Sequence, residues 1–273
     1  MIRSDCHLHS SFSSDSDTPM EHMVLRGIEL GLTSMCMTEH LDYDYPPNEE
    51  GLDFLLDFDS YYKEYLRLKD KYQDKIELFF GIELGLMPHL DARYQKVTDS
   101  YDFDFVIGSS HLVDGMDPYE PEYFQKYDSR QGVRKYFESI YENITSCRHV
   151  DYQVYGHLDY VIRYAPDKNT FFHFADYQDI LDEILIALIK SEKGIEVNTA
   201  GLKYGLGQPN PHIDILKRYR ELGGSILTIG SDGHKPEHMA YDFHKLPAIL
   251  KEAGFDHYTL FRKRKPYEIP ILL

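Results

Sequence analysis

Apolar and polar residues follow two periods along the chain, and the two periods predict strands and helices in alternation. Short apolar runs, such as 77–84 and 103–109, are typical of buried strands. Segments with apolar residues three or four positions apart, such as 176–193, predict amphipathic helices. Predicted strands open at 1–4 and continue at 33–38, 77–84, 103–109, 152–155, 194–198 and 225–229, with a tail strand near 258–261. Predicted helices lie at 19–31, 59–74, 131–148, 176–193, 211–222 and 244–253.

Local signals mark the helix ends and the connections. Thr18 and Glu21 have the spacing of a capping box, with Pro19 in the first helical position and Gly31 after the last turn. Three polar connections follow strands, and we expect them to form the mouth of a pocket: 41–58, 112–129 and 199–210.

Alternation of strand and helix, repeated about seven times, predicts parallel strands with helices outside them. No repeat, low-complexity tract or linker interrupts residues 1–273, which we expect to form one domain. An open doubly wound sheet is the competing architecture. A closed barrel is favoured because polar side chains at all the strand ends converge only around a common axis. These side chains are His7, His9, His40, Glu83, His111, His157, Asn198, Asp232 and His234.

The first of these strand ends carries two histidines one residue apart. At period two, His7 and His9 face the same side, and Asp5 lies behind them on that face. Two imidazoles on one face form a chelating pair for a transition metal. Two exposed histidines near a flexible terminus are the alternative, and the donors at later strand ends argue against it.

Taken together, the donors at the strand ends outnumber the ligands of a single ion. A tetrahedral or five-coordinate metal takes four or five ligands, so this set fits a cluster of two or three ions. No cysteine joins the set, which suits zinc, manganese or iron. Taken singly, each donor has another explanation, such as a loop hydrogen bond or a helix cap, but their joint occurrence at strand ends argues against coincidence. The candidate ligands are His7, His9, Asp15, His40, Glu83, His111, His157, Asp232 and His234.

Composition narrows the partners. The chain has 273 residues with 29 Lys and Arg against 46 Asp and Glu, so the net charge is 29 − 46 = −17. This charge disfavours nucleic acid and anionic membranes as partners. Three cysteines without a CxxC pair indicate a reducing compartment, and no apolar run is long enough to span a bilayer. We expect a cytoplasmic protein, and the sequence does not predict its oligomeric state.

The order of these motifs resembles the PHP (polymerase and histidinol phosphatase) superfamily. The resemblance runs from residue 5 to residue 234, and Arg163-Tyr164 with the segment 198–202 are similar to its histidinol-phosphatase branch. It implies a distorted (β/α)7 barrel with a trinuclear metal site at the C-terminal strand ends. The motifs are Asp5-x-His7-x-His9, Thr38-Glu39-His40, Gly81-Ile82-Glu83, Ser110-His111, Gly156-His157-Leu158-Asp159 and Ser231-Asp232-Gly233-His234.

The resemblance also implies a distribution of the ligands over three ions. One ion takes His7, His9, Glu83 and Asp232; a second takes His111 and His157 with Glu83 as a bridge; a third takes Asp15, His40 and His234. Many relatives have histidine where this chain has Asp15, and Asp17 competes for that role. Asp5 is expected to orient an imidazole from outside the ligand set.

The predicted chemistry is phosphomonoester hydrolysis. Three divalent ions carry +6 and three carboxylates return −3, so the pocket is locally positive despite the acidic chain. A water bridging two metals is deprotonated near neutral pH and serves as the nucleophile. Asp232 or His234 is expected to assist the leaving group. Arg163 is expected to bind the phosphate, Lys203 is a weaker candidate, and Asn198 and Asp42 are further substrate-binding candidates.

The resemblance narrows the substrate to L-histidinol phosphate, whose hydrolysis is a step of histidine biosynthesis. A PHP-type phosphatase acting on a nucleotide or another small substrate is one alternative. A non-catalytic metal-binding or proofreading-accessory module is another. The acidic composition, the lack of a basic stripe and the single-domain length argue against a nucleic-acid role, and the complete ligand set argues against a non-catalytic site.

Overall fold

A curved sheet of parallel strands forms the centre of the molecule. The computed structural model describes residues 2–48, 51–170 and 172–272. The strand order is β1-β2-β4-β5-β6-β7-β8, and β3 pairs with β4. Every neighbouring pair in this sheet is parallel. The strands are β1 (Ser4–Leu8), β2 (Ser34–Met37), β3 (His40–Leu41), β4 (Glu77–Gly85), β5 (Phe105–Ser109), β6 (Val154–Tyr155), β7 (Gly194–Asn198) and β8 (Leu227–Gly230).

The two edges of this sheet meet just beyond β1 and β8. The amide of Asp232 donates to the carbonyl of His7 at 2.9 Å, and the amide of His9 donates to the carbonyl of Gly233 at 3.0 Å. These bonds bring the last parallel strand back to the first, so the sheet is a nearly closed barrel. The predicted distorted (β/α)7 barrel is therefore confirmed over the open doubly wound sheet.

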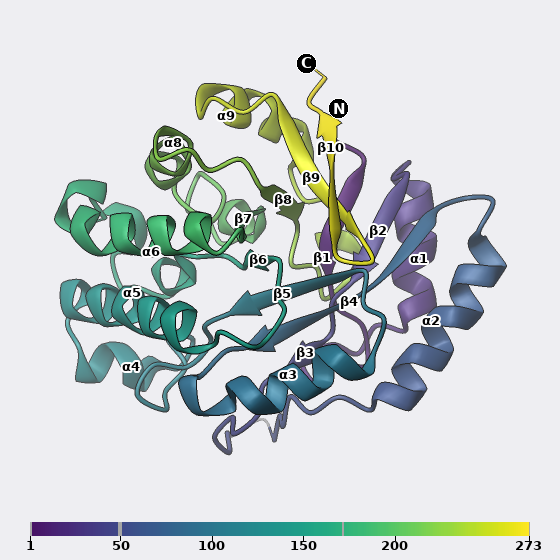
Figure 1. Ribbon diagram of the computed structural model, residues 1–273, viewed down its shortest axis with the longest axis horizontal. Helices are drawn as coiled ribbons and strands as arrows, with labels where there is room; N and C mark the ends of the chain where they lie inside the picture. Colours follow the sequence, from purple (N-terminus) through teal and green to yellow (C-terminus); the bar gives the residue numbers. More distant parts are fainter. Residues whose placement is uncertain (1, 49–50, 171, 273) are drawn as a thin grey trace.

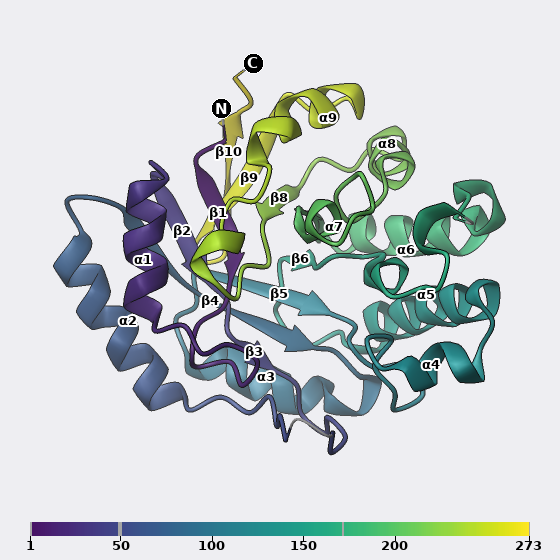
Figure 2. The ribbon, with the colours of Figure 1, turned by 180° about the vertical axis from the view of Figure 1, so that it is seen from behind.

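Helices surround the strands on the outside (Figures 1 and 2). The longer helices bury an apolar face, as in α6, where Ile180, Leu181, Ile184, Leu185 and Leu188 are buried. The helices are α1 (Met20–Glu29), α2 (Phe58–Tyr72), α3 (Asp91–Ser100), α4 (Pro121–Lys126), α5 (Ser129–Ser146), α6 (Gln178–Lys190), α7 (Ala200–Lys203), α8 (Ile213–Glu221) and α9 (Leu246–Glu252). Short 3-10 turns include η1 (Pro88–Leu90), η2 (Tyr160–Arg163), η3 (Lys168–Thr170), η4 (Phe174–Asp176), η5 (Pro236–His238) and η6 (Phe243–Lys245).

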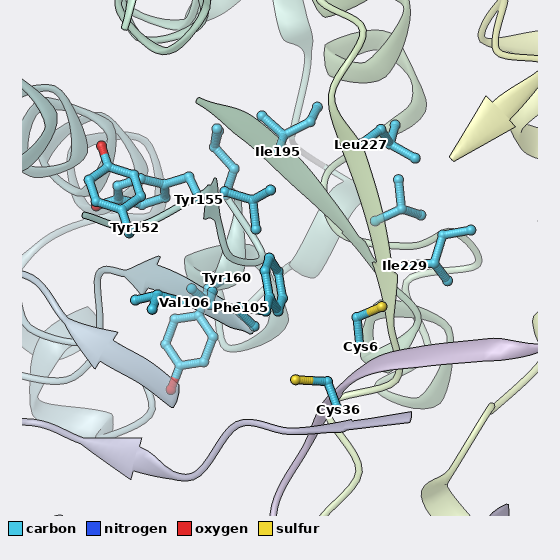
Figure 3. Close-up of a cluster of buried hydrophobic side chains, with 14 of the residues drawn as sticks. Cys6, Cys36, Phe105, Val106, Tyr152, Tyr155, Tyr160, Ile195, Leu227 and Ile229 are labelled. Carbon is cyan, nitrogen blue, oxygen red and sulfur yellow. The ribbon is translucent and has the colours of Figure 1, made fainter. Parts of the chain in front are cut away.

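An antiparallel hairpin, β9 (His257–Arg262) and β10 (Lys265–Pro270), covers one end of the barrel. Phe261 of β9 stacks on Phe105 at the start of β5, with ring centroids 5.3 Å apart. Figure 3 shows part of the apolar core, with Cys6 and Cys36 near Phe105. All three cysteines of the chain are buried and free. The hairpin therefore closes the amino-terminal end of the barrel and leaves the other end for the polar strand ends.

The structure differs from the sequence prediction at several elements. Helices α3 and α4 lie in segments where no helix was predicted, because their amphipathic patterns are short and polar on average. The predicted tail strand has a partner, β10, that the sequence did not reveal. The capping box does not form: the residue before α1 is Pro19, and the Thr18 hydroxyl instead donates to the carbonyl of His234 at 3.1 Å. Within the described residues, every helix is too short or too polar to cross a bilayer.

Candidate metal centre and substrate pocket

Glu83, near the end of β4, is the carboxylate around which five imidazoles gather, four of them within 3.3 Å. Its Oε2 lies 3.1 Å from His7 Nε2 and 3.1 Å from His40 Nδ1. Its Oε1 lies 2.9 Å from His157 Nε2 and 3.3 Å from His111 Nε2. Burial opposes ionisation of this carboxyl, but the surrounding imidazoles hold its pKa well below the ordinary value. Glu83 is therefore ionised although it is fully buried, and its two oxygens are positioned to serve more than one cation.

A second group forms around Asp15, on the loop between β1 and α1. Its Oδ2 lies 2.9 Å from His234 Nε2 and 3.6 Å from His40 Nε2. The two imidazole nitrogens are 3.4 Å apart. The structure therefore brings Asp15 to these histidines, whereas no contact of Asp17 with them is found in the described part of the chain.

His9 and Asp232 connect these two groups. His9 Nε2 lies 3.6 Å from Asp232 Oδ1 and 3.5 Å from Glu83 Oε2. All nine candidate ligands are thus at one end of the barrel. Donor atoms within 4.8 Å of one another form four overlapping sets: His9, His40 and His234; His7, Glu83 and His157; His7, His9 and Asp232; and His40, Glu83 and His111.

Several of the spacings between these donors are longer than hydrogen bonds and fit ligands of a shared metal ion. Hydrogen bonds between nitrogen and oxygen are about 2.9–3.0 Å long, whereas two ligands of one tetrahedral ion, each bonded at about 2.1 Å, are roughly 3.4 Å apart. The contacts of His9 at 3.5 and 3.6 Å match the second distance. His9 Nε2 and His40 Nδ1 are also buried without a hydrogen-bond partner. The imidazole and carboxylate set therefore fits a site for divalent transition metals.

Two of the candidate ligands lie in the left-handed region of backbone conformation. His157 has φ of 21° and Asp232 has φ of 55°. Residues with a side chain adopt such angles rarely, and they do so mainly where the surrounding structure holds them for function. The strand ends therefore turn sharply at β6 and β8 and direct these two side chains into the barrel.

Glu196, on β7, was missed by the sequence analysis. It contacts two of the candidate metal ligands, His7 and His157, on the side away from the other donors. Its Oε1 accepts from His7 Nδ1 at 2.7 Å, and its Oε2 accepts from the His157 amide at 2.9 Å and from Asn198 Nδ2 at 3.0 Å. A Cβ at Gly230 would collide with Glu196 and His7, so glycine makes room for this contact. The sequence signal for Glu196 was the alternation of side chains along a strand, which places Glu196 on the same face of β7 as Asn198.

Two other carboxylates make contacts that the sequence analysis did not predict. Asp5 does not orient an imidazole; its oxygens accept from the amide and hydroxyl of Ser231 and from the amide of Ala240. Asp5, two residues before His7 in β1, therefore fixes the loop after β8. Asp42 orients an imidazole instead, because its Oδ1 is 2.6 Å from His111 Nδ1. Its contact with the substrate stays a prediction.

The loop that carries Asp15 is also held by a buried carboxylate. Glu39 accepts from the amide and hydroxyl of Ser10 at 2.9 and 2.6 Å, and from the hydroxyl of Ser13 at 2.6 Å. Ser13 in turn accepts from the amide of His40 at 3.0 Å. One carboxylate therefore ties the loop after β1 to the segment after β2, and both segments carry candidate ligands.

A cavity of about 440 Å³ opens above the donors. The three connections predicted to form its mouth all contribute, through Tyr45, Asp117 and Lys203 among others. Residues 49 and 50 of the first connection lie outside the described residues. His238, which was not among the predicted site residues, also lines this cavity. Its position in η5, just after the His234 motif, was the only local signal of that role.

Arg163 lies in the wall of this cavity, at the end of η2, and three acceptors hold it. Its Nε donates to Asn210 Oδ1 at 2.8 Å, Nη1 to Asp232 Oδ2 at 2.9 Å and Nη2 to Asn198 Oδ1 at 3.1 Å. A guanidinium has five N–H groups, so two remain without a partner in the described part of the chain. Arg163 is only 4% exposed, and its orientation is therefore fixed before any ligand binds.

The other predicted substrate residues divide between the cavity and the interior. Lys203 lines the cavity. Burial lowers the pKa of its ammonium, and the nearby charges of Arg163 and Lys235 lower it further, whereas the charge of Asp232 raises it. Asn198 differs from the prediction because it lies behind Arg163: its side chain is fully buried, and both ends of its amide are bonded within the protein. It therefore positions Arg163.

The sequence matches the model of the PHP domain over residues 5–200, and the chain belongs to this family. Two of its relatives bear the names histidinol-phosphatase and probable histidinol-phosphatase. The histidinol-phosphatase of Lactococcus lactis subsp. lactis is 33% identical over 266 residues, covering 97% of this chain and 96% of the relative. A probable histidinol-phosphatase of Clostridium acetobutylicum is 33% identical over 239 residues, covering 88% of this chain and 89% of the relative.

Solved structures agree with the fold. A crystal structure of histidinol phosphate phosphatase from Lactococcus lactis, complexed with zinc, L-histidinol and phosphate, matches with a TM-score of 0.87 and 32% identity. The match covers 97% of this chain and 98% of that chain. A putative histidinol phosphatase from Listeria monocytogenes matches with a TM-score of 0.78 at 21% identity, which supports the fold alone; it covers 89% of this chain and 99% of that chain.

Proposed function

We propose that this chain is a metal-dependent phosphatase that hydrolyses L-histidinol phosphate to L-histidinol and inorganic phosphate, a step of histidine biosynthesis. One observation carries the proposal: the metal-donor cluster and the fixed guanidinium of Arg163 share one cavity. Relatives of this chain over nearly its full length are named histidinol phosphatases, and a similar structure holds zinc, L-histidinol and phosphate.

The metal site is proposed to hold three divalent ions of zinc, manganese or iron. The sets around His7, His9 and Asp232, around Glu83, His111 and His157, and around Asp15, His40 and His234 would each hold one ion, with Glu83 as the bridge. When bound, such ions supply a water activated near neutral pH and positive charge for the phosphoryl oxygens.

Arg163 is proposed to bind the phosphoryl group. Its two remaining N–H groups suit a bidentate contact with two phosphoryl oxygens, a geometry that lysine does not offer. Because Asn198, Asn210 and Asp232 fix the guanidinium in advance, little conformational entropy is lost when the substrate binds. Lys203 adds positive charge to the same cavity and is proposed as a second phosphate contact.

Asp232 and His234 are proposed to take part in the reaction beside their role as ligands. Both line the cavity, and the leaving alcohol needs a proton or a stabilising charge. Asp232 also connects the two halves of the site, since its Oδ2 accepts from Arg163 and its Oδ1 faces His9. The position of the phosphoryl group is thereby linked to that of the metal ligands.

A phosphate-release assay on a panel of substrates tests this function. The metal-loaded protein is assayed on L-histidinol phosphate, nucleoside monophosphates and phosphotyrosine. We expect the highest kcat/KM on L-histidinol phosphate, and loss of activity on all substrates in Glu83→Gln. A higher kcat/KM on a nucleotide or on phosphotyrosine would replace the proposed substrate, and no release from any of them would favour a non-catalytic metal-binding module.

A further inference from the structure

Asp117 is a buried carboxylate in the wall of the cavity that the proposed reaction does not use. It follows β5 in the connection to α4 and is only 6% exposed. Its Oδ2 accepts from the Tyr45 hydroxyl at 2.9 Å. Its Oδ1 accepts from the Tyr119 amide at 2.8 Å and from the Tyr160 hydroxyl at 3.1 Å. Three donors from three segments therefore fix its orientation.

The charge of Asp117 is not neutralised by a neighbour in ion-pair contact. Its hydrogen-bond partners within the described residues are two phenols and an amide, all neutral. The other buried carboxylates of the cavity wall differ, because Asp42 contacts His111 at 2.6 Å and Asp232 contacts Arg163 at 2.9 Å. A buried carboxylate without a cation is unfavourable, and burial indeed raises the pKa of Asp117. A bound cation would remove this penalty.

The surroundings of Asp117 suit an organic cation. Tyr45 packs against Phe54 with ring centroids 4.5 Å apart, and Tyr160 packs against Tyr164 at 5.0 Å. All four rings line the same cavity as Asp117. Aromatic faces attract ammonium and imidazolium groups, and they also accept a planar ring by stacking.

The cavity is also lined by cationic residues, so its wall carries both positive and negative charge. Arg163, Lys203 and Lys235 line it together with Asp117. No acidic side chain in the described residues forms an ion pair with Lys203 or Lys235, so their charges are available to an anion. A ligand with a phosphate at one end and a positively charged nitrogen at the other matches this arrangement. A nucleoside monophosphate has no such nitrogen at neutral pH.

We propose that Asp117, held by Tyr45 and Tyr160, binds the positively charged nitrogen of the substrate and selects phosphomonoesters that carry a cationic group over those that do not. This inference rests on the proposed phosphatase function and adds a specificity-determining residue to it. Asp42 is less suited to this role, because His111 already engages its carboxylate.

Substrate pairs that differ in charge test the inference. The metal-loaded wild type and Asp117→Asn are compared on L-histidinol phosphate and on p-nitrophenyl phosphate, which carries no cation. We expect kcat/KM on L-histidinol phosphate to fall by roughly 10- to 100-fold, mainly through KM, since a hydrogen bond to a charged group is lost. Activity on p-nitrophenyl phosphate and the metal content should stay within about twofold of wild type.

Two further variants make the result specific. Tyr45→Phe removes one donor to Asp117 and should lower kcat/KM on the cationic substrate by a smaller factor. Asp114→Asn is the matched control, because Asp114 lies in the same connection, pairs with Tyr127 and Lys135, and does not line the cavity. It should leave both activities unchanged.

The outcomes separate this inference from the proposed function. Equal losses on both substrates in Asp117→Asn, or no loss on either, would overturn the inference. A wild type that is inactive on L-histidinol phosphate would overturn the proposed function, and O-phosphoethanolamine then serves as the cationic substrate. A preference for it over p-nitrophenyl phosphate that disappears in Asp117→Asn would retain the role of Asp117, whereas no such preference would remove it.

Discussion

The imidazole of His7 is fixed at both of its nitrogens. Nδ1 contacts Glu196 at 2.7 Å, and Nε2 faces Glu83 at 3.1 Å. A carboxylate behind a ligating imidazole sets the tautomer and raises the basicity of the nitrogen that faces the metal. His111 has the same arrangement, with Asp42 behind it. The positions of the candidate metal ligands therefore depend on carboxylates that lie behind their imidazoles.

The first prediction concerns Glu196. In Glu196→Gln the amide keeps a hydrogen bond to His7 but loses the negative charge, so we expect metal affinity to fall by roughly 10- to 100-fold. A competition titration with a chromogenic zinc chelator measures this affinity. Glu192→Gln, at an exposed position just before β7, is the control and should bind zinc like wild type. Equal affinity in both variants would show that Glu196 does not support the site.

The second prediction concerns Arg163. Lysine can replace its charge but not its paired N–H groups, so Arg163→Lys should lower kcat/KM by roughly 100-fold while the metal content stays the same. Steady-state kinetics and elemental analysis on one preparation measure both quantities. Arg130→Lys, on the exposed start of α5, is the control. A kcat/KM close to wild type would remove Arg163 from phosphate binding, and loss of metal would show that its bond to Asp232 is its main role.

At the scale of elements, the barrel is held in shape by contacts at the ends of helices as well as by strand pairing. Asp91, the first residue of α3, accepts from the amides of His149 and Val150 at 3.0 Å each and lies 2.6 Å from His149 Nδ1. These bonds fix the connection from α5 to β6, a strand of only two residues. Because β6 leads into His157, the contact of Asp91 helps to position this candidate metal ligand.

The third prediction concerns the pH dependence of this contact. Partial burial opposes ionisation, but hydrogen bonds from His149 and Val150 keep the pKa of Asp91 below its ordinary value. A lowered carboxyl pKa stabilises the fold above the unfolded pKa of about 3.9 and loses that contribution as the pH falls through the folded pKa. We expect Asp91→Asn to lower the free energy of unfolding by about 1–3 kcal/mol at pH 7.

Urea unfolding at several pH values measures this difference. The gap between wild type and Asp91→Asn should start to shrink below about pH 4, where the unfolded carboxyl is protonated, and should close as the pH falls through the lower pKa of the folded carboxyl. Asp99→Asn, at an exposed position of the same helix, is the control. A gap that is independent of pH would mean that packing, and not the ionised carboxylate, makes the contribution of Asp91.

At the scale of the whole molecule, an acidic chain is proposed to handle an anionic substrate. The net charge is −17, yet Arg163, Lys203 and Lys235 line the cavity. Three divalent ions would add +6 where the three carboxylate ligands contribute −3, so the local charge is the reverse of the global one. The surrounding negative charge also favours a substrate that carries a cation, in line with the role proposed for Asp117.

The fourth prediction concerns removal of the metal. Ligands that bind only the folded state stabilise it by about 4 kcal/mol at a thousandfold excess over Kd. For a chain of this size we therefore expect a chelator to lower Tm by roughly 5–10 °C, and zinc or manganese to restore it. Elemental analysis of the reloaded protein should give about three ions per chain. A Tm unaffected by the chelator, or at most one ion after reloading, would contradict the proposed cluster.

The sequence by itself determined the architecture and most of the donor set. Alternating strand and helix patterns predicted the parallel barrel, and the polar residues after each strand predicted which end carries chemistry. Both follow from local rules: the period of a pattern selects the element, and the carboxyl ends of parallel strands share one face. For this reason the order of residues alone was enough to group His111 and His157, each ambiguous when taken singly, as candidate ligands of one site.

Only the tertiary structure decided which side chains meet across the barrel. Glu196 contacts His7 from 189 residues away, Asp42 faces His111, and Asp5 holds the loop after β8 where an imidazole was expected. The period of a strand fixes the face of a residue, but not its neighbour on that face. That neighbour depends on strand order, register and closure, and these are properties of the whole chain.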